Sequence, residues 1–169
     1  MCIIIDTNCL NEVFDTSNKH HNEFKPVFNW VYLGKGKIVY GGSKYLSEIG
    51  KYLTLFLNLN KAGKAIYVDN NKVDDEEVVV STIIQDPDFD DQHLVALLRV
   101  SGCKLICSRD KRAYPFFRHQ RFFSPANTKP KIYSSSKNKG LLKDKNIAEI
   151  CKPANKTTKQ QRDMIGELQ

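Results

Sequence analysis

Four acidic residues stand where the chain is expected to leave a strand or to enter a helix. Asp6 directly follows an apolar run at residues 2–5, and Asp110 comes soon after another such run. Asp91 opens an apolar helix, and Glu48 lies early in the helix after a second strand. Clustered carboxylates repel one another, and a hard divalent cation with oxygen ligands relieves that repulsion. The pattern therefore predicts a Mg²⁺ or Mn²⁺ site that activates water and stabilises charge on a phosphoryl oxygen.

Each of these acids also has a simpler structural interpretation. Asp6 could cap the helix that follows it, Glu48 could be a solvated helix residue, and Asp110 could belong to a turn. Asp91 could be a first-turn acid favoured by the helix dipole. Because four acids from four separate segments are expected at one edge of a sheet, we favour a shared role in metal binding over four unrelated structural roles.

Other polar residues lie close to the four acids in the sequence. Asn8 and Ser108 are expected to support the site by contacting water or metal-bound water, and Asp90 is a further supporting acid beside Asp91. His93 lies one turn into the apolar helix, where a lone histidine is more often packed or exposed than a base. We therefore assign it no catalytic role.

The elements that must position these residues alternate along the chain. β-branched and apolar runs predict strands at residues 2–5, 37–40, 65–68 and 105–107, with a last edge strand at 131–133. Helices are expected between them, at 43–58, over the acidic and valine-rich stretch 74–80, and at 91–101, which is apolar on all sides. This alternation predicts an α/β fold, a three-layer α/β/α sandwich around a mostly parallel sheet. In such folds the ligand site lies at the carboxyl ends of the strands.

The chain has 169 residues and a net charge of +7, which suggests a polyanionic partner, nucleic acid rather than membrane. Most of that charge falls late, since residues 125–169 carry ten basic and four acidic side chains. We therefore expect a domain at 1–133 and a basic C-terminal extension at 134–169. The extension is expected to start with a linker at 134–140 and to hold helices at 141–151 and 156–168.

A second basic cluster follows the last acidic motif. Its members, the expected nucleic-acid-binding residues, are Arg109, Lys111, Arg112, Arg118 and Arg121. Aromatic residues are interleaved with them: Tyr114, Phe116, Phe117, Phe122 and Phe123. The mixture suits base stacking combined with phosphate contacts. The alternative is a loop whose aromatic side chains pack onto the core.

The five cysteines are scattered and odd in number, without a C-x-x-C pair, which argues against a disulfide framework or a structural zinc site. No apolar run approaches the ~20 residues that a transmembrane helix requires. The first residues lack the basic segment of a signal peptide. These features predict a cytoplasmic protein with reduced thiols and no membrane association.

Two blocks of the sequence resemble those of PIN-domain nucleases. The opening Ile3-Ile4-Ile5-Asp6-Thr7-Asn8 is similar to the first strand and first acid of that family. The stretch 90–110 resembles its second half, with an acid, a buried helix, Gly102, a strand and a final Ser108-Arg109-Asp110. Glu48 is similar to the helical glutamate between the two blocks. The resemblance covers roughly residues 1–125 and leaves the extension outside it.

The resemblance implies a metal-dependent phosphodiesterase, most often acting on RNA. It implies that Asp6, Glu48, Asp91 and Asp110 hold one or two Mg²⁺ or Mn²⁺ ions. Many small family members are toxins neutralised by a partner protein, so the resemblance is compatible with an inhibitory protein partner. Self-association into a homo-oligomer is a separate hypothesis. The leading hypothesis is thus a metal-dependent endoribonuclease. A structure-selective DNA nuclease and a catalytically inert nucleic-acid-binding module remain as alternatives.

Overall fold

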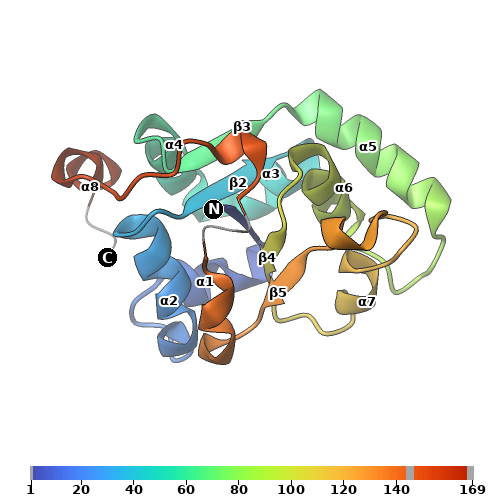
Figure 1. Ribbon diagram of the computed structural model, residues 1–169, viewed down its shortest axis with the longest axis horizontal. Helices are drawn as coiled ribbons and strands as arrows, with labels where there is room; N and C mark the ends of the chain where they lie inside the picture. The colour runs from blue at the N-terminus through green and yellow to red at the C-terminus, as the bar shows by residue number, and fades with distance from the viewer. Residues whose placement is uncertain (1, 144–146, 167–169) are drawn as a thin grey trace.

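The computed structural model describes residues 2–143 and 147–166. A five-stranded, all-parallel sheet forms its centre, in the order β3-β2-β1-β4-β5 (Figure 1). The strands are β1 (Cys2–Ile5), β2 (Lys37–Gly41), β3 (Ala65–Val68), β4 (Leu105–Cys107) and β5 (Lys131–Tyr133). All five lie where the sequence predicts them, and the expected α/β sandwich is confirmed.

The central strands are apolar because helices cover both of their faces. Every residue of β1 and of β4 is buried. In the register of these two strands Ile5 lies opposite Cys107, and the next amide, that of Asp6, donates to the Cys107 carbonyl at 2.9 Å. The strand order reverses between β1 and β4, so their carboxyl ends form the switch point at which ligands bind in folds of this kind.

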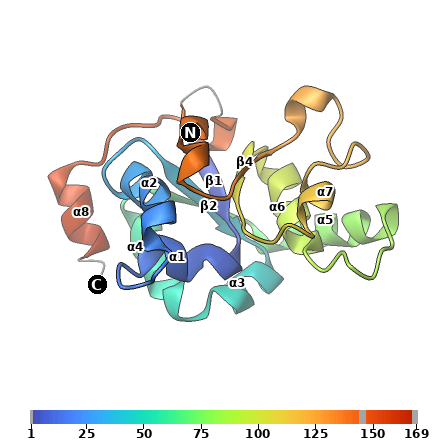
Figure 2. The same ribbon diagram turned by 90° about the horizontal axis from the view of Figure 1, so that it is seen from below.

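The helices form the two outer layers (Figure 2). On the left of the sheet in that view lie α1 (Leu10–Phe14), α2 (His21–Tyr32) and α4 (Leu53–Lys61). On the right lie α5 (Asn70–Ile83), α6 (Gln92–Ser101) and the short α7 (Tyr114–Phe117). A 3₁₀ turn at Thr7–Cys9 joins β1 to α1, and α3 (Ser43–Ile49) follows β2.

The helix expected at 43–58 is divided in two. It is interrupted at Gly50, whose φ of +51° lies in the left-handed region, and a 3₁₀ turn at Gly50–Tyr52 leads into α4. Ser43 does not cap α3 as its type suggests, because Gly42 occupies that position and the Ser43 amide and hydroxyl both donate to Asp74. The division leaves α3 as a short helix at the carboxyl edge of the sheet.

The helices of the right-hand layer follow the sequence more closely. The stretch 74–80 is helical, as expected, but the helix begins earlier, at Asn70, because the Asp69 side chain caps it. The buried helix expected at 91–101 is α6, with Asp91 as its N-cap residue and Gly102, at φ +64°, as its C-cap. The Asp91 side chain makes no capping hydrogen bond.

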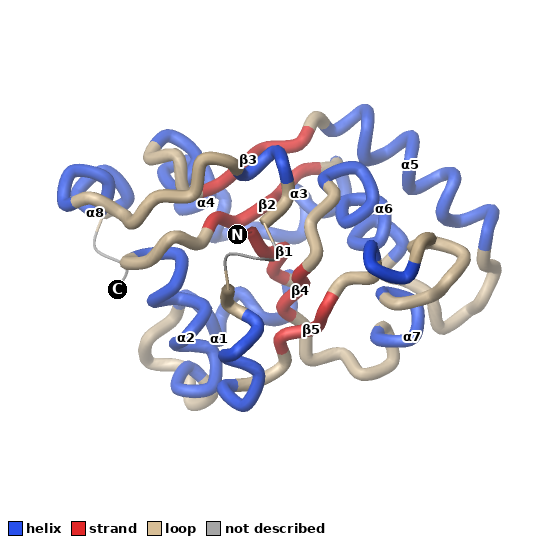
Figure 3. Tube along the Cα trace, in the orientation of Figure 1, coloured by secondary structure: helices blue, strands red, loops and turns tan. Residues whose placement is uncertain are grey.

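The chain after β5 is mostly loop with short helical turns (Figure 3). The linker expected at 134–140 is instead largely a 3₁₀ helix (Ser136–Leu141), since Glu23 of α2 accepts from the backbone and hydroxyl of Ser136. The helices expected at 141–151 and 156–168 shorten to a 3₁₀ turn at Glu149–Cys151 and to α8 (Lys159–Ile165). Parts of both expected helices, residues 144–146 and 167–168, lie outside the described residues.

The extension lies against the domain rather than apart from it. Cys151 and Ile165 are buried, and the Thr157 amide donates to the Gly34 carbonyl at 3.1 Å. The side-chain amide of Gln161 donates to the Ala62 carbonyl at 2.7 Å. Within the described part of the chain, no helix has the length and apolar character needed to cross a membrane.

Candidate active site at the carboxyl edge of the sheet

Asp6 occupies the switch point itself. Its side chain is 1% exposed and is held by two donors, the Asn8 amide at 3.0 Å and the Ser108 hydroxyl at 2.7 Å. The first of these contacts is the capping role that the simpler interpretation assigned to Asp6, and it leaves lone pairs on both carboxylate oxygens. Capping and membership of an acidic cluster are therefore compatible.

A buried tyrosine ties α3 to the end of β1. The Tyr45 hydroxyl donates to the Ile5 carbonyl at 2.7 Å, and the side chain is completely buried. Glu48 follows Tyr45 by three residues, so the two lie on neighbouring faces of the helix. The contact therefore holds α3 where Glu48 can reach the end of β1.

Glu48 contacts residues from both sides of the switch point. Its Oε2 accepts from the Thr7 hydroxyl at 3.1 Å and lies 3.2 Å from Nε2 of His93. His93 is 2% exposed, and burial lowers its pKa to about 4, so the ring is neutral at pH 7. His93 is thus a packed residue that positions Glu48, in line with the sequence-based interpretation.

Ser108 links Asp110 to Asp6. Its hydroxyl oxygen accepts a hydrogen bond from the Asp110 amide at 3.1 Å, and the same hydroxyl group donates to the Asp6 carboxylate. The Asp110 carboxylate also forms an ion pair with Arg112, with Oδ2 lying 3.1 Å from Nη2. This guanidinium holds the pKa of Asp110 below its ordinary value. Of the four predicted acids, Asp110 therefore has a positive charge beside it, that of Arg112.

Asp91 has no such partner among the described residues, and its pKa is raised by burial and also by the neighbouring acids. Its pKa is raised from 3.8 to about 7, first by burial and then by the negative charges of Asp6, Asp90, Asp110 and Glu48. The pKa of Asp6 is also raised, first by burial and then by Asp110 and Glu48. The four predicted acids, with Asp90, are therefore close enough to act on one another's ionisation.

Three of these acids, Glu48, Asp90 and Asp91, line an open, polar cavity of about 430 Å³, whereas Asp6 and Asp110 are not among its lining residues. Its lining residues are Thr7, Asn8, Lys44, Glu48, Asp90 and Asp91. Lys44 is the one cation among them, and its ammonium donates to the Asp90 carbonyl at 2.8 Å. The cavity is thus an acidic cleft with a single positive charge on its wall.

The donor set of this cleft suits a hard divalent cation. Over residues 2–143 and 147–166, no three His, Cys, Asp or Glu side chains are grouped tightly enough to hold a metal ion by themselves. Mg²⁺ is usually bound by one or two carboxylates together with water and substrate phosphates, so it does not require a closed protein cage. Asp6 is buried and Asp91 is half-buried, and the pKa of each carboxyl is raised first by burial and then by neighbouring negative charges. We conclude that the residues fit Mg²⁺ or Mn²⁺ in donor type.

The five predicted nucleic-acid-binding residues do not form one surface. Arg109 pairs with Glu12, with 2.8 Å between Nη1 and Oε1, and Arg112 pairs with Asp110. Lys111 and Arg118 line a second cavity beside α7, and Arg121 is exposed. Most of the interleaved aromatic residues pack inward, as the alternative interpretation held: Phe117, Phe122 and Phe123 are buried, and Phe116 stacks on Phe89.

Sequence reasoning missed three residues that shape the cleft. Thr7 and Tyr45 position Glu48 and α3, and Lys44 brings a cation to the acidic wall. Lys44 precedes Glu48 by four residues, the spacing of neighbours on one helix face, and this signal could have identified it. Tyr45 could have been found only through its contact with Ile5, which the sequence does not reveal.

Comparison of the chain with family models, with curated proteins and with solved structures gives no match.

Proposed function

We propose that this protein is a Mg²⁺- or Mn²⁺-dependent endoribonuclease that hydrolyses phosphodiester bonds at the acidic cleft. One observation carries the proposal: at the switch point of a parallel sheet, Glu48, Asp90 and Asp91 line one cavity, and Ser108 joins Asp6 to Asp110 by hydrogen bonds; the neighbouring acids add to the effect of burial in raising the pKa of Asp91. A fold gains no stability from gathering carboxylates in this way, and perturbed ionisation of this kind is typical of functional sites.

In this proposal Asp6, Glu48, Asp91 and Asp110 hold the metal ion. The ion, when bound, supplies an activated water and stabilises negative charge on the phosphoryl oxygens. Ser108 and the Asn8 amide keep the Asp6 carboxylate in place, and Thr7 and His93 do the same for Glu48.

The reaction is a hydrolysis. The oxygen of water forms a bond to phosphorus, the bond between phosphorus and the 3′ oxygen breaks, and that oxygen takes up a proton. Lys44 stands on the wall of the cleft, where its ammonium can contact a substrate phosphate. The preference for RNA over DNA rests on the resemblance to PIN-domain nucleases, as does a toxin role with an inhibitory protein partner.

The test is a cleavage assay with the full-length protein on single-stranded RNA, single-stranded DNA and branched DNA, in Mg²⁺, Mn²⁺ or EDTA. We expect RNA cleavage that requires metal and is lost in Asp91→Asn. A matched control is Asp75→Asn, because Asp75 is an exposed acid of α5 with no ion pair to the described residues, and this variant should cleave like the wild type. Cleavage of branched DNA alone would favour a structure-selective DNA nuclease. RNA binding without cleavage would favour an inert binding module.

A further inference from the structure

A cavity of about 490 Å³ lies beside α7. Its lining residues are Lys111, Tyr114, Pro115, Arg118, Lys129 and Ile132. They come from α7 and its flanks and from the segment that leads into β5. The cavity thus combines three cationic side chains with an aromatic ring and apolar side chains.

The three cations of this cavity have no acidic partner among the described residues. Across residues 2–143 and 147–166, Lys111, Arg118 and Lys129 form no ion pair with an acid, and none of the six lining residues is acidic. Three like charges around one cavity repel one another, and an anion placed among them removes that repulsion. The chemistry of the cavity therefore suits a ligand that carries phosphate.

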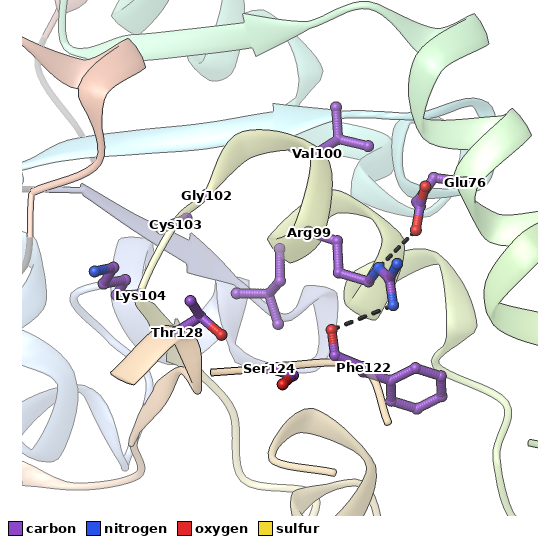
Figure 4. Close-up of a pocket in the computed structure, with 10 residues that line it drawn as sticks. Glu76, Arg99, Val100, Gly102, Cys103, Lys104, Phe122, Ser124 and Thr128 are labelled. Carbon is purple, nitrogen blue, oxygen red and sulfur yellow. Dashed lines mark hydrogen bonds and ion pairs between the residues drawn. The ribbon is translucent and has the colours of Figure 1, made fainter. Parts of the chain in front are cut away.

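A different cavity of the molecule contains an arginine that is paired with an acid. It has a volume of about 360 Å³ and lies at the far end of α6, where Arg99 reaches towards Glu76 and Phe122 (Figure 4). The Arg99 guanidinium lies 2.6 Å from the Glu76 carboxylate and also donates to the Phe122 carbonyl at 3.2 Å. Arg99 thus already has partners within the protein, whereas the cations beside α7 form no ion pair within the part of the chain that the structure describes.

Tyr114 connects the cavity to the candidate active site. Its hydroxyl donates to the Ser108 carbonyl at 2.8 Å, and the Ser108 hydroxyl holds Asp6. Lys111 directly follows Asp110 in the chain. A strand whose phosphate lies in the acidic cleft therefore has its next nucleotides within reach of this cavity.

Tyr114 is also the aromatic residue of its segment that lines this cavity. It is half-buried and lines the cavity, while Phe117, Phe122 and Phe123 are buried in the core. Stacking on a protein ring requires a base that is not already stacked in a duplex, so a ring beside phosphate-binding cations favours a single strand.

We propose that this cavity binds a nucleotide of a single-stranded nucleic acid, next to the nucleotide whose bond is cleaved. Lys111, Arg118 and Lys129 bind its phosphate groups, and Tyr114 supports its base. The inference rests on the proposed nuclease function, and it adds Lys129 to the substrate-binding residues that the sequence indicates.

Binding is measured in EDTA, so that cleavage plays no part. The full-length protein is titrated into fluorescently labelled single-stranded RNA, and the anisotropy is followed at several salt concentrations. Lys129→Ala should weaken binding and reduce the slope of log affinity against log salt by about 0.7, the contribution of one phosphate contact in a single strand. Lys129→Arg should restore the slope. Lys61→Ala is the matched control, because Lys61 is an exposed lysine at the end of α4 with no ion pair to the described residues, and it should leave the slope unchanged.

A second pair of variants tests the ring. Tyr114→Leu should weaken binding by about 5-fold or more, since stacking on an aromatic side chain contributes roughly 1–3 kcal/mol per base. Tyr114→Phe keeps the ring and should bind within about 2-fold of the wild type, on the same stacking argument. Thermal unfolding of each variant identifies any loss of affinity that comes from loss of the fold.

Competitors decide the class of ligand. Unlabelled single-stranded RNA or DNA should displace the probe, whereas duplex RNA and polyglutamate should do so poorly. An unchanged salt slope in folded Lys129→Ala, displacement by polyglutamate as effective as by RNA, or absence of RNA binding by the wild type would each overturn the inference. RNA binding that depends on Lys129 in a protein that never cleaves would instead refute the proposed nuclease function and leave this binding site standing.

Discussion

Replacing Asp91 by Asn should stabilise the folded protein at neutral and alkaline pH in the absence of metal. The pKa of Asp91 rises from 3.8 to about 7 in the folded state. Because one pH unit corresponds to about 1.4 kcal/mol, complete burial would set the cost of its ionisation near 4 kcal/mol. Asp91 is only half-buried and solvent screens its charge, so we expect a gain of about 2 kcal/mol in the variant.

The gain should depend on pH in a defined direction. An acid whose pKa is raised on folding binds its proton more tightly in the folded state, so the free energy of unfolding falls as pH rises from about 4 to about 7. Asn at this position cannot ionise and removes that fall. The difference between Asp91→Asn and the wild type should therefore be small near pH 4, grow up to pH 7 and stay constant above it.

Denaturant unfolding in EDTA between pH 4 and pH 9, followed by circular dichroism, measures this difference directly. Asp75→Asn serves as the control, because Asp75 is exposed and should show no such dependence. A variant that is less stable than the wild type at pH 8, or a difference that does not change with pH, would refute the assignment of Asp91 to a cluster of mutually repelling acids.

Three further predictions concern the metal, the position of α3 and the C-terminal extension. Mn²⁺ or Mg²⁺ should raise the melting temperature of the wild type through preferential binding to the folded state and should have no such effect on Asp6→Asn; an equal rise in both proteins would place the ion elsewhere. Tyr45→Phe should lower the free energy of unfolding by about 1 kcal/mol, because the Ile5 carbonyl loses a buried donor, and a thermal melt identical to that of the wild type would contradict this. Ile165→Ala should lower the free energy of unfolding by about 2–4 kcal/mol, measured with denaturant, because the side chain is only 3% exposed. A change within experimental error would mean that α8 contributes nothing to the stability of the domain.

The strands and the buried helix could be predicted because their signals are local. The run Cys2–Ile5 is apolar at every position and consists of isoleucine after Cys2, and α6 is apolar on nearly all sides; both patterns are typical of the buried elements of a parallel fold. The interruption at Gly50 was harder to foresee, since a glycine within an apolar helical pattern is often tolerated. The extension could not be predicted, because contacts such as that of Thr157 with Gly34 join residues far apart in the sequence.

The candidate site, like the fold, could be predicted from the sequence only in part. The order of strands and helices was sufficient to place Asp6, Glu48, Asp91 and Asp110 at one edge of the sheet, since that edge follows from the connectivity of parallel βαβ units. The ion pair between Arg112 and Asp110 escaped prediction, because short-range pairs in a loop depend on the turn that the backbone adopts. Lys129 escaped for a different reason: it approaches Lys111 and Arg118 only when β5 joins the sheet beside β4.

The products of RNA cleavage test the central claim most directly. Single-stranded RNA labelled at its 5′ end is incubated with the wild type and with Asp91→Asn in Mn²⁺ and in EDTA, and the chemistry of the new ends is determined. Hydrolysis by water at the acidic cleft leaves a 5′ phosphate and a 3′ hydroxyl, and we expect these ends from the wild type in Mn²⁺ and no cleavage by Asp91→Asn. Cleavage that persists in EDTA, that leaves 2′,3′-cyclic phosphates, or that Asp91→Asn performs at the wild-type rate would contradict the account.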